Sequence, residues 1–141
     1  MTRTYLLPFP PSVNHYWKAA RRYSGRGRAY TGKVLTDNAQ SFRAAAIEAV
    51  IKAHGGRYPQ PLVGRLDVTL TLFWPDLKAY DVDNYSKGIL DALTHARVWN
   101  DDVQARNAHL LDGEVLKGGA VLVEIRECLH DPVPFPKEFA A

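Results

Sequence analysis

The sequence predicts a single α/β domain (α+β), in which two main helices cover a small mixed sheet of about four strands. Three patterns carry this prediction. Residues 65–74 alternate apolar and polar side chains with a period of two, which is typical of a half-buried strand. Residues 38–54 and the segment from 83 to 97 repeat apolar side chains at helical spacing. A chain of 141 residues has the length of one domain, so we expect residues 1–141 to form one unit.

The N-terminal quarter of the chain begins with a short predicted strand at residues 4–7. Three prolines follow it, and prolines cannot donate hydrogen bonds to a sheet. Residues 12–36 contain several glycines and no apolar periodicity, so we expect a loop, with a basic stretch at residues 18–33. A loop of this length in a compact domain is usually functional or disordered.

The first helix is expected over residues 38–54, with Asp37 as its N-cap. Its apolar stripe contains Ala39, Phe42, Ala46 and Val50. The strand at 65–74 follows, with Leu66, Val68, Leu70, Leu72 and Trp74 on one face. Pro75 ends this strand. The second helix is expected to be capped by Asp83 or Asn84 and to end near Arg97.

The last third of the chain is expected to complete the sheet. Residues 103–111 alternate weakly, and residues 121–126 alternate clearly as a final strand. The glycine-containing segment 112–119 between them indicates a hairpin connection. Residues 128–141 have three prolines and no periodicity, so an irregular C-terminal tail is expected.

Positive charge is concentrated at the start of the chain. The net charge is +3, but residues 1–36 hold seven basic side chains and no acidic one. A concentrated basic field suits a polyanion, and phosphate contacts are the main source of affinity for nucleic acid. The alternative is a solvated loop whose charge only keeps the protein in solution. The charge pattern favours nucleic acid as the partner.

The same composition sets the expected cellular compartment. No apolar run approaches the roughly 20 residues that span a bilayer, and the N-terminus lacks the apolar region of a signal peptide. Cys128 is the sole cysteine, so we expect neither an intrachain disulfide nor a cysteine zinc site. We therefore expect a cytoplasmic protein without a membrane partner.

The segment after the central strand carries the candidate chemistry. Asp81 and Asp83 would project to the same side of an extended backbone and could converge on one cation. Lys87 stands four residues after Asp83, as an i, i+4 pair if the helix begins there. The pair Asp101 and Asp102 lies after the helix, and either could complete the cluster. Oxygen ligands at this density suit Mg²⁺, with Mn²⁺ as a substitute.

Such a set fits metal-assisted cleavage of a phosphodiester. The ion polarises the phosphate and activates water, and the lysine stabilises the developing charge. The alternative, a solvated loop with Asp83 as a helix cap, explains one aspartate but not the set. We expect Asp91 to be a structural ion-pair partner that could hold Lys87. Trp99 is expected in the core.

Four blocks of the sequence resemble the RusA family of Holliday junction resolvases, small endodeoxyribonucleases often carried by phages and prophages. The blocks are Pro10-Pro11-Ser12-Val13-Asn14-His15-Tyr16-Trp17, Asp81-Val82-Asp83-Asn84 with Lys87, Asp91-Ala92-Leu93, and Trp99-Asn100-Asp101-Asp102-Val103-Gln104. The resemblance implies a RusA-like fold and catalytic, Mg²⁺-binding carboxylates at Asp81, Asp83 and Asp102. It also implies an essential Lys87 and a homodimer that nicks a four-way junction symmetrically.

The basic segment and the first block together give the expected DNA-contacting residues: Asn14, His15, Tyr16, Trp17, Lys18, Arg21, Arg22, Arg26, Arg28, Lys33 and Lys78. The expected function is Mg²⁺-dependent resolution of Holliday junctions in recombination and repair. Two alternatives stay open: a non-catalytic DNA-binding protein with the same fold, and a nuclease acting on flaps or other branched DNA. The number of ions per site and any sequence preference at the cut are also open.

Overall fold

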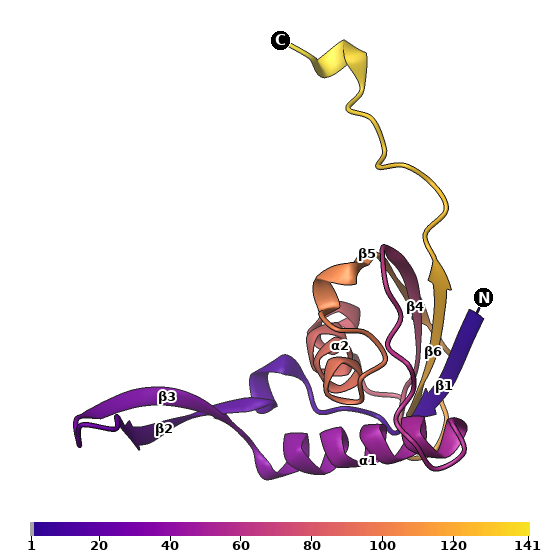
Figure 1. Cartoon of the computed structure of the whole chain (residues 1–141). Coiled ribbons are helices and arrows are strands. Elements are labelled where there is room, and N and C mark those ends of the chain that lie inside the picture. The colour runs from indigo at the N-terminus through magenta and orange to yellow at the C-terminus, as the bar shows by residue number, and fades with distance from the viewer. Residues whose placement is uncertain (1) are drawn as a thin grey trace.

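A computed structural model describes residues 2–141 of the protein (Figure 1). Four short 3-10 helices, η1 to η4, cover Val13–His15, Val82–Asn84, Asp102–Gln104 and Lys137–Phe139. The strands and α-helices within the described residues are β1 (Thr2–Leu7), β2 (Trp17–Tyr23), β3 (Ala29–Leu35), α1 (Asp37–Ala53), β4 (Leu66–Phe73), α2 (Ser86–His95), β5 (Ala105–Asp112) and β6 (Ala120–Glu127).

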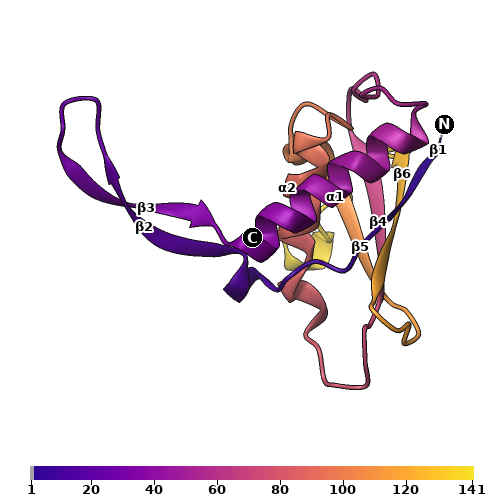
Figure 2. The same ribbon diagram turned by 90° about the horizontal axis from the view of Figure 1, so that it is seen from below.

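The main sheet has four strands in the order β1-β6-β4-β5. β4 and β5 are parallel, and the other two pairings are antiparallel, so the sheet is mixed. Both α-helices lie on one side of it, as Figures 1 and 2 show. The predicted fold class, a mixed sheet of four strands with two covering helices, is confirmed.

The connection between β5 and β6 differs from the predicted hairpin. The two strands are not neighbours, because α2 carries the chain back and places β5 parallel to β4 at the sheet edge. Residues 113–119 must therefore cross the end of β4 to reach its other side. Gly113 and Leu116 donate backbone hydrogen bonds to the carbonyls of Leu72 and Trp74, each at 2.9 Å, which fixes this crossing.

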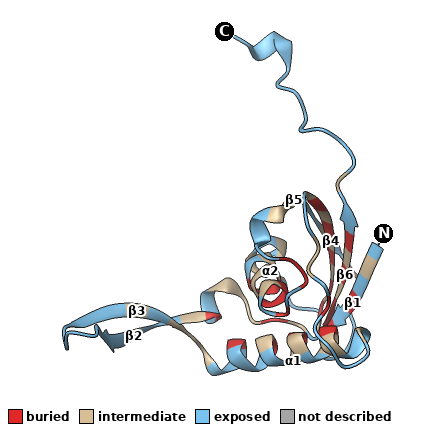
Figure 3. Cartoon of the chain, viewed as in Figure 1, coloured by how far each residue is buried: buried red, intermediate tan, exposed pale blue. Residues whose placement is uncertain are grey.

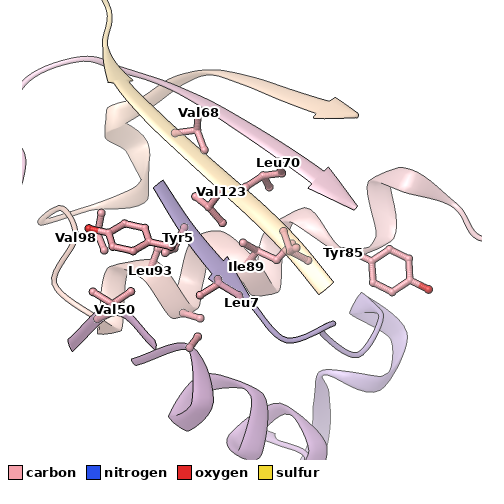
Figure 4. Close-up of a cluster of buried hydrophobic side chains, with 14 of the residues drawn as sticks. Tyr5, Leu7, Val50, Val68, Leu70, Tyr85, Ile89, Leu93, Val98 and Val123 are labelled. Atoms are coloured by element: carbon pink, nitrogen blue, oxygen red, sulfur yellow. The ribbon is translucent and has the colours of Figure 1, made fainter. Parts of the chain in front are cut away.

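The core lies between the sheet and the two helices (Figure 4). β4 is one of the two inner strands, and its inward side chains are fully buried, as the period of two predicts. Trp99 is also buried, as expected. Burying an aliphatic side chain such as those of β4 contributes about 1.5–3 kcal/mol. The buried layer between the sheet and the helices is therefore the main source of stability. The buried side chains that α2, β6 and α1 add are Ile89, Leu93, Val121, Val123, Ile125, Phe42, Ala46 and Val50.

Both helix starts differ from the prediction by a few residues. α1 is capped by Thr36, whose hydroxyl oxygen accepts a hydrogen bond from the Ala39 amide at 3.2 Å, and Asp37 is the first helical residue. α2 begins at Ser86, because Val82–Asn84 forms the separate turn η2. Neither Asp83 nor Asn84 is therefore its cap.

Residues 18–33 are not a loop, contrary to the prediction. β2 and β3 pair in continuous antiparallel register from Trp17–Leu35 to Tyr23–Ala29. The hairpin, which we call the basic arm (residues 17–35), projects from the body of the domain (Figures 1 and 2). Almost all of its residues are at least partly exposed on both faces (Figure 3). Since neither face packs on a core, the sequence carries no period-two signal there.

The tail after β6 is exposed and extends away from the domain (Figures 1 and 3). Within residues 128–141 the one regular element is the short 3-10 turn η4. No helix in the described part of the chain combines the length and apolarity that crossing a membrane requires.

We predict that Gly88→Ala destabilises the protein. A Cβ at this position would meet the buried ring of Tyr16 at 2.5 Å, and overpacking of this kind costs about 1–3 kcal/mol. Urea denaturation measures the free energy of unfolding. Gly25→Ala is the matched control, because its Cβ would meet nothing within 4 Å. Equal costs for the two variants would contradict the packing of Tyr16 on α2.

Candidate active site

Lys87 lies on the first turn of α2, beside the base of the basic arm. Tyr16 is fully buried there, and its hydroxyl donates to the carbonyl oxygen of Gly88 at 3.3 Å. The Trp17 ring packs against Tyr16 with 4.5 Å between centroids, and the Lys87 ammonium lies 5.3 Å from the centroid of Trp17. The expected i, i+4 pair with Asp83 is not formed, since Asp83 is in η2, outside the helix. Lys87 is held by an aromatic face instead.

Asp91 is a structural ion-pair partner, as predicted, but its partner is not Lys87. Its carboxylate accepts from the Arg43 guanidinium at 2.6 Å, which ties α2 to α1. His95 lies 3.8 Å from the other carboxylate oxygen. Because both groups of the Arg43 pair are partly shielded from solvent, this contact fixes the relative position of the two helices.

The chain reverses sharply at the end of α2. Arg97 adopts a left-handed conformation with φ 61°, and the Val98 amide donates back to the Leu93 carbonyl at 3.1 Å. Trp99 is buried, and its indole nitrogen donates to the Thr94 hydroxyl at 2.8 Å. These contacts anchor the segment that carries the second acidic pair, so that η3 returns along α2.

The two aspartates of η3 have different positions. Asp101 is the N-cap and accepts from the Val103 amide at 3.0 Å. The Gln104 side chain completes a capping box by accepting from the amides of Asn100 and Asp101. The capping box therefore engages the Asp101 carboxylate with the backbone, and the Asp102 side chain takes no part in it. Spacing alone does not separate these two residues.

Asp102 stands in a locally negative environment. Its pKa is raised, first by burial, then by a hydrogen bond and the charge of Asp101 and by the charge of Asp91. The Lys87 ammonium acts in the opposite direction and lowers the pKa. The structure thus brings Asp102, Asp91 and Lys87 within electrostatic reach of one another. Since Arg43 already pairs with Asp91, the aspartates Asp101 and Asp102 face Lys87 with an excess of negative charge, which a cation would relieve.

Asp81 and Asp83 lie on the exposed segment that leads into α2. Asp81 is extended and accepts from the Asn84 side chain at 3.4 Å. Asp83 is in the 3-10 turn, so the prediction that both side chains share one side of an extended strand is wrong in its geometry. After burial, the Asp81 charge is the second cause of the raised pKa of Tyr85. Tyr85 packs in an aromatic group with Phe9, Trp74 and Tyr80.

The carboxylates of Asp81, Asp83 and Asp102 are not packed into one tight group in this conformation. Within residues 2–141, the one trio of acidic, cysteine or histidine ligand atoms that lie within 4.8 Å of one another belongs to Asp67, Cys128 and His130. The metal-binding role of the three aspartates stays a prediction. No short motif predicts the other trio, because Asp67 lies 61 residues before Cys128 in the chain. Cys128 is half-buried and surrounded by polar groups.

Most of the predicted DNA-contacting side chains lie on exposed surface. The basic residues of the arm are exposed, and Lys78 is exposed on the loop after β4. Tyr16 is the exception: because it is fully buried against Gly88, it cannot meet DNA in this structure. Tyr23 and Tyr30 on the arm are 67% and 51% exposed, and both were missed as candidate contacts.

Comparison with known proteins decides the family. The family model described as endodeoxyribonuclease RusA matches residues 8–126. This chain belongs to the RusA family. The matched range begins at the prolines after β1 and ends in β6, so it includes the basic arm and both acidic segments, and the resemblance inferred from the four sequence blocks is confirmed.

Similar RusA proteins occur in phages and in Escherichia coli. The chain is 29% identical over 123 residues to the crossover junction endodeoxyribonuclease rusA of Enterobacteria phage HK97, covering 87% of this chain and 92% of the relative. It is 30% identical over 129 residues to the protein of the same name from Escherichia coli K12, covering 89% and 95%. For the protein of Enterobacteria phage 82, the identity is 31% over 121 residues, covering 86% and 91%.

We predict that Asp102→Asn raises the melting temperature at neutral pH. Since the folded-state pKa of Asp102 is raised, its ionised form disfavours folding above that pKa. The gain should shrink as the pH falls below the raised folded-state pKa of Asp102 and should vanish below the unfolded-state pKa of about 3.9, where Asp102 is protonated in both states. Thermal denaturation at a series of pH values from about 3 to about 7 would measure the difference in melting temperature between the variant and the unaltered protein.

The neighbouring residue gives the control for that measurement. Asp101→Ala removes the N-cap acceptor of η3 and should destabilise the protein by about 0.5–2 kcal/mol. Opposite signs for adjacent aspartates are expected only if Asp102 carries unrelieved negative charge. A melting temperature that falls in both variants would contradict this assignment.

Proposed function

We propose that this chain is a divalent-metal-dependent endodeoxyribonuclease that cuts four-way DNA junctions. The observation that carries the proposal is an anchored Asp102, freed by the capping box and set beside Lys87, within a RusA-family domain. The relatives named above are crossover junction endodeoxyribonucleases. Junction cutting belongs to recombination and repair, and from the phage and Escherichia coli relatives we infer that the protein acts in a bacterial cytoplasm, where the DNA lies.

Asp81, Asp83 and Asp102 are the residues that would hold the ion. The donor set fits a hard cation, because all its ligands are carboxylate oxygens and Asp102 already lies in excess negative charge. We infer Mg²⁺ as this ion, with Mn²⁺ as a substitute. When bound, the ion polarises the phosphate and lowers the pKa of water. Asp81 and Asp83 are exposed on the segment before α2, where they face solvent and an incoming strand.

Lys87 would contact the phosphate that is cut. Its ammonium is exposed and lies over the Trp17 ring, an arrangement worth about 0.5–1 kcal/mol at an exposed site. This contact orients the lysine without neutralising it, so its full charge can oppose the charge that develops on the phosphate. Trp17 is then a positioning residue at the base of the basic arm.

The basic arm would bind the DNA backbone. Its exposed cations stand on both strands of the hairpin, and the register places Arg22 opposite Tyr30. Arginine side chains bind phosphates, and exposed tyrosines stack on unpaired bases. We propose a homodimer as the active form, because two symmetric nicks in a junction need two identical sites related by a two-fold axis.

A second candidate function is DNA binding without cleavage. It is favoured by one observation: the three aspartates do not form a tight group of ligand atoms in this structure. Under this hypothesis Asp101 and the turn η2 serve as local structure only. Nuclease activity on flaps or other branched DNA is a matter of substrate choice and uses the same residues.

We predict that Asp83→Asn or Asp102→Asn lowers the rate of junction cutting by about 10²–10³-fold while binding is kept. A synthetic four-way junction with labelled arms, incubated with Mg²⁺ or with a chelator, measures both steps at fixed salt. Glu48→Gln is the matched control, since it removes one exposed carboxylate from α1 outside the site. Full cutting by either aspartate variant, or cutting in the presence of chelator, would contradict a metal site at these aspartates. Binding of the junction without any cutting by the unaltered protein would favour DNA binding without cleavage.

We also predict that the arm sets the salt dependence of binding. Replacing Arg26 and Arg28 by alanine removes two cations from the arm tip, and the slope of log K against log salt should fall by up to about 2. Lys117→Ala with Lys137→Ala removes the same charge from the β5–β6 connection and the tail. If both double variants change the slope equally, the arm has no special role in binding.

A further inference from the structure

Asp67, Cys128 and His130 form a compact group of side chains on the sheet face that the helices leave open. Asp67 alternates with the buried Leu66 and Val68 on β4, so its side chain points away from α1 and α2. Cys128 follows β6 directly, and its amide donates to the Arg65 carbonyl at 2.9 Å. His130 stands two residues further, where the tail begins. The group is therefore on the opposite side of the sheet from Lys87 and Asp91.

The ligand atoms of this group converge on one point. His130 Nε2 lies 3.5 Å from an oxygen of Asp67 and 3.7 Å from the sulfur of Cys128, and all three ligand atoms are within 4.8 Å of one another. Around a tetrahedral zinc ion, with metal–ligand bonds of about 2.0–2.3 Å, neighbouring ligand atoms are about 3.4–3.6 Å apart. The two separations from Nε2 need little adjustment to hold such an ion.

The neighbouring contacts orient the ligands. His130 Nδ1 lies 3.2 Å from the Asp131 carbonyl oxygen, which can only accept, so Nδ1 donates to it and Nε2 is the ring nitrogen available to a metal. The Asn107 amide donates to Asp67 at 2.6 Å and holds that carboxylate in place. Outer contacts of both kinds are typical of metal-binding histidine and carboxylate side chains.

The same geometry argues against a nucleophilic cysteine. In a Cys-His-Asp triad the thiol and the carboxylate contact different ring nitrogens. Here both approach Nε2, and the other nitrogen is taken by the backbone. A single ion placed among the Cys128 sulfur, the Asp67 oxygen and Nε2 would contact all three, whereas the triad arrangement is not formed.

We propose that Asp67, Cys128 and His130 bind one Zn²⁺ ion per chain, with a fourth position open to water. One cysteine excludes a site of several cysteines, but not a mixed site whose ligands are 61 residues apart along the chain. Thiolate and imidazole favour zinc over magnesium. On binding, the Cys128 thiol, which otherwise donates to the His130 carbonyl at 3.5 Å, loses its proton to solvent as the sulfur–zinc bond forms. The ion fixes the start of the tail against β4.

The test uses the full chain, freed of metal by a chelator and titrated with Co²⁺ and then Zn²⁺. One equivalent of Co²⁺ should give tetrahedral d–d bands and a thiolate-to-cobalt charge-transfer band, and Zn²⁺ should remove both. Zn²⁺ should also raise the melting temperature, while Mg²⁺ in equal amount should not reproduce this. This proposal does not depend on nuclease activity, so its readout is separate from junction cutting.

Variants locate the ion. Cys128→Ser should abolish the charge-transfer band and the Zn²⁺-dependent rise in melting temperature, and His130→Gln should weaken zinc binding by at least about tenfold. His95→Gln, a histidine at the end of α2 on the other side of the sheet, is the matched control and should bind zinc normally. Circular dichroism confirms that each variant is folded. Absence of one-equivalent binding, or unchanged binding in Cys128→Ser and His130→Gln, would overturn the proposal.

Discussion

The geometry of the candidate active site depends on the chain reversal that ends α2. A ten-residue helix is about 15 Å long, so the acidic segments before and after it would be held far apart if the chain continued outward. The left-handed Arg97, the Val98–Leu93 hydrogen bond and the buried Trp99 turn the chain back along the helix. That reversal brings Asp102 close enough to Lys87 and Asp91 for their charges to affect its pKa. It also delivers the chain to β5, parallel to β4, so fold and site share one local structure.

The parts of the fold that were predictable from the sequence are those where one face is buried. β4 and β6 alternate because the helices cover one side of each, and α1 repeats apolar residues because it packs on the same core. The arm was predicted as a loop because both of its faces meet solvent, which removes the pattern that marks a strand. The strand order could not be predicted either. A connection with glycines near residues 113 and 118 is typical of a hairpin, but it looks the same when the two strands that it joins are not neighbours. Pairing partners depend on the α2 crossover, which local composition does not encode.

The site was predictable in its residue types but less so in its geometry. Motif spacing identified the acidic segments and Lys87. It did not reveal that Asp101 is consumed by a capping box, that Lys87 lies over Trp17, or that Arg43 holds Asp91. Each of these contacts joins residues whose proximity follows from tertiary packing. The Asp67–Cys128–His130 group is the extreme case, because register between β4 and the end of β6 creates it and no short motif announces it. The two groups also divide by chemistry: oxygen donors on the helix side, and mixed sulfur, nitrogen and oxygen donors on the open face.

The basic arm has a mechanical consequence. An isolated two-stranded ribbon is marginally stable in water, and this one is attached to the domain only where Trp17 and Leu35 meet the core. The free energy needed to unfold the arm locally is therefore much lower than the free energy needed to unfold the main sheet. The hinge of this ribbon contains the tryptophan that supports the Lys87 ammonium. A change in the direction of the arm at its base would therefore also move the aromatic ring that the Lys87 ammonium contacts.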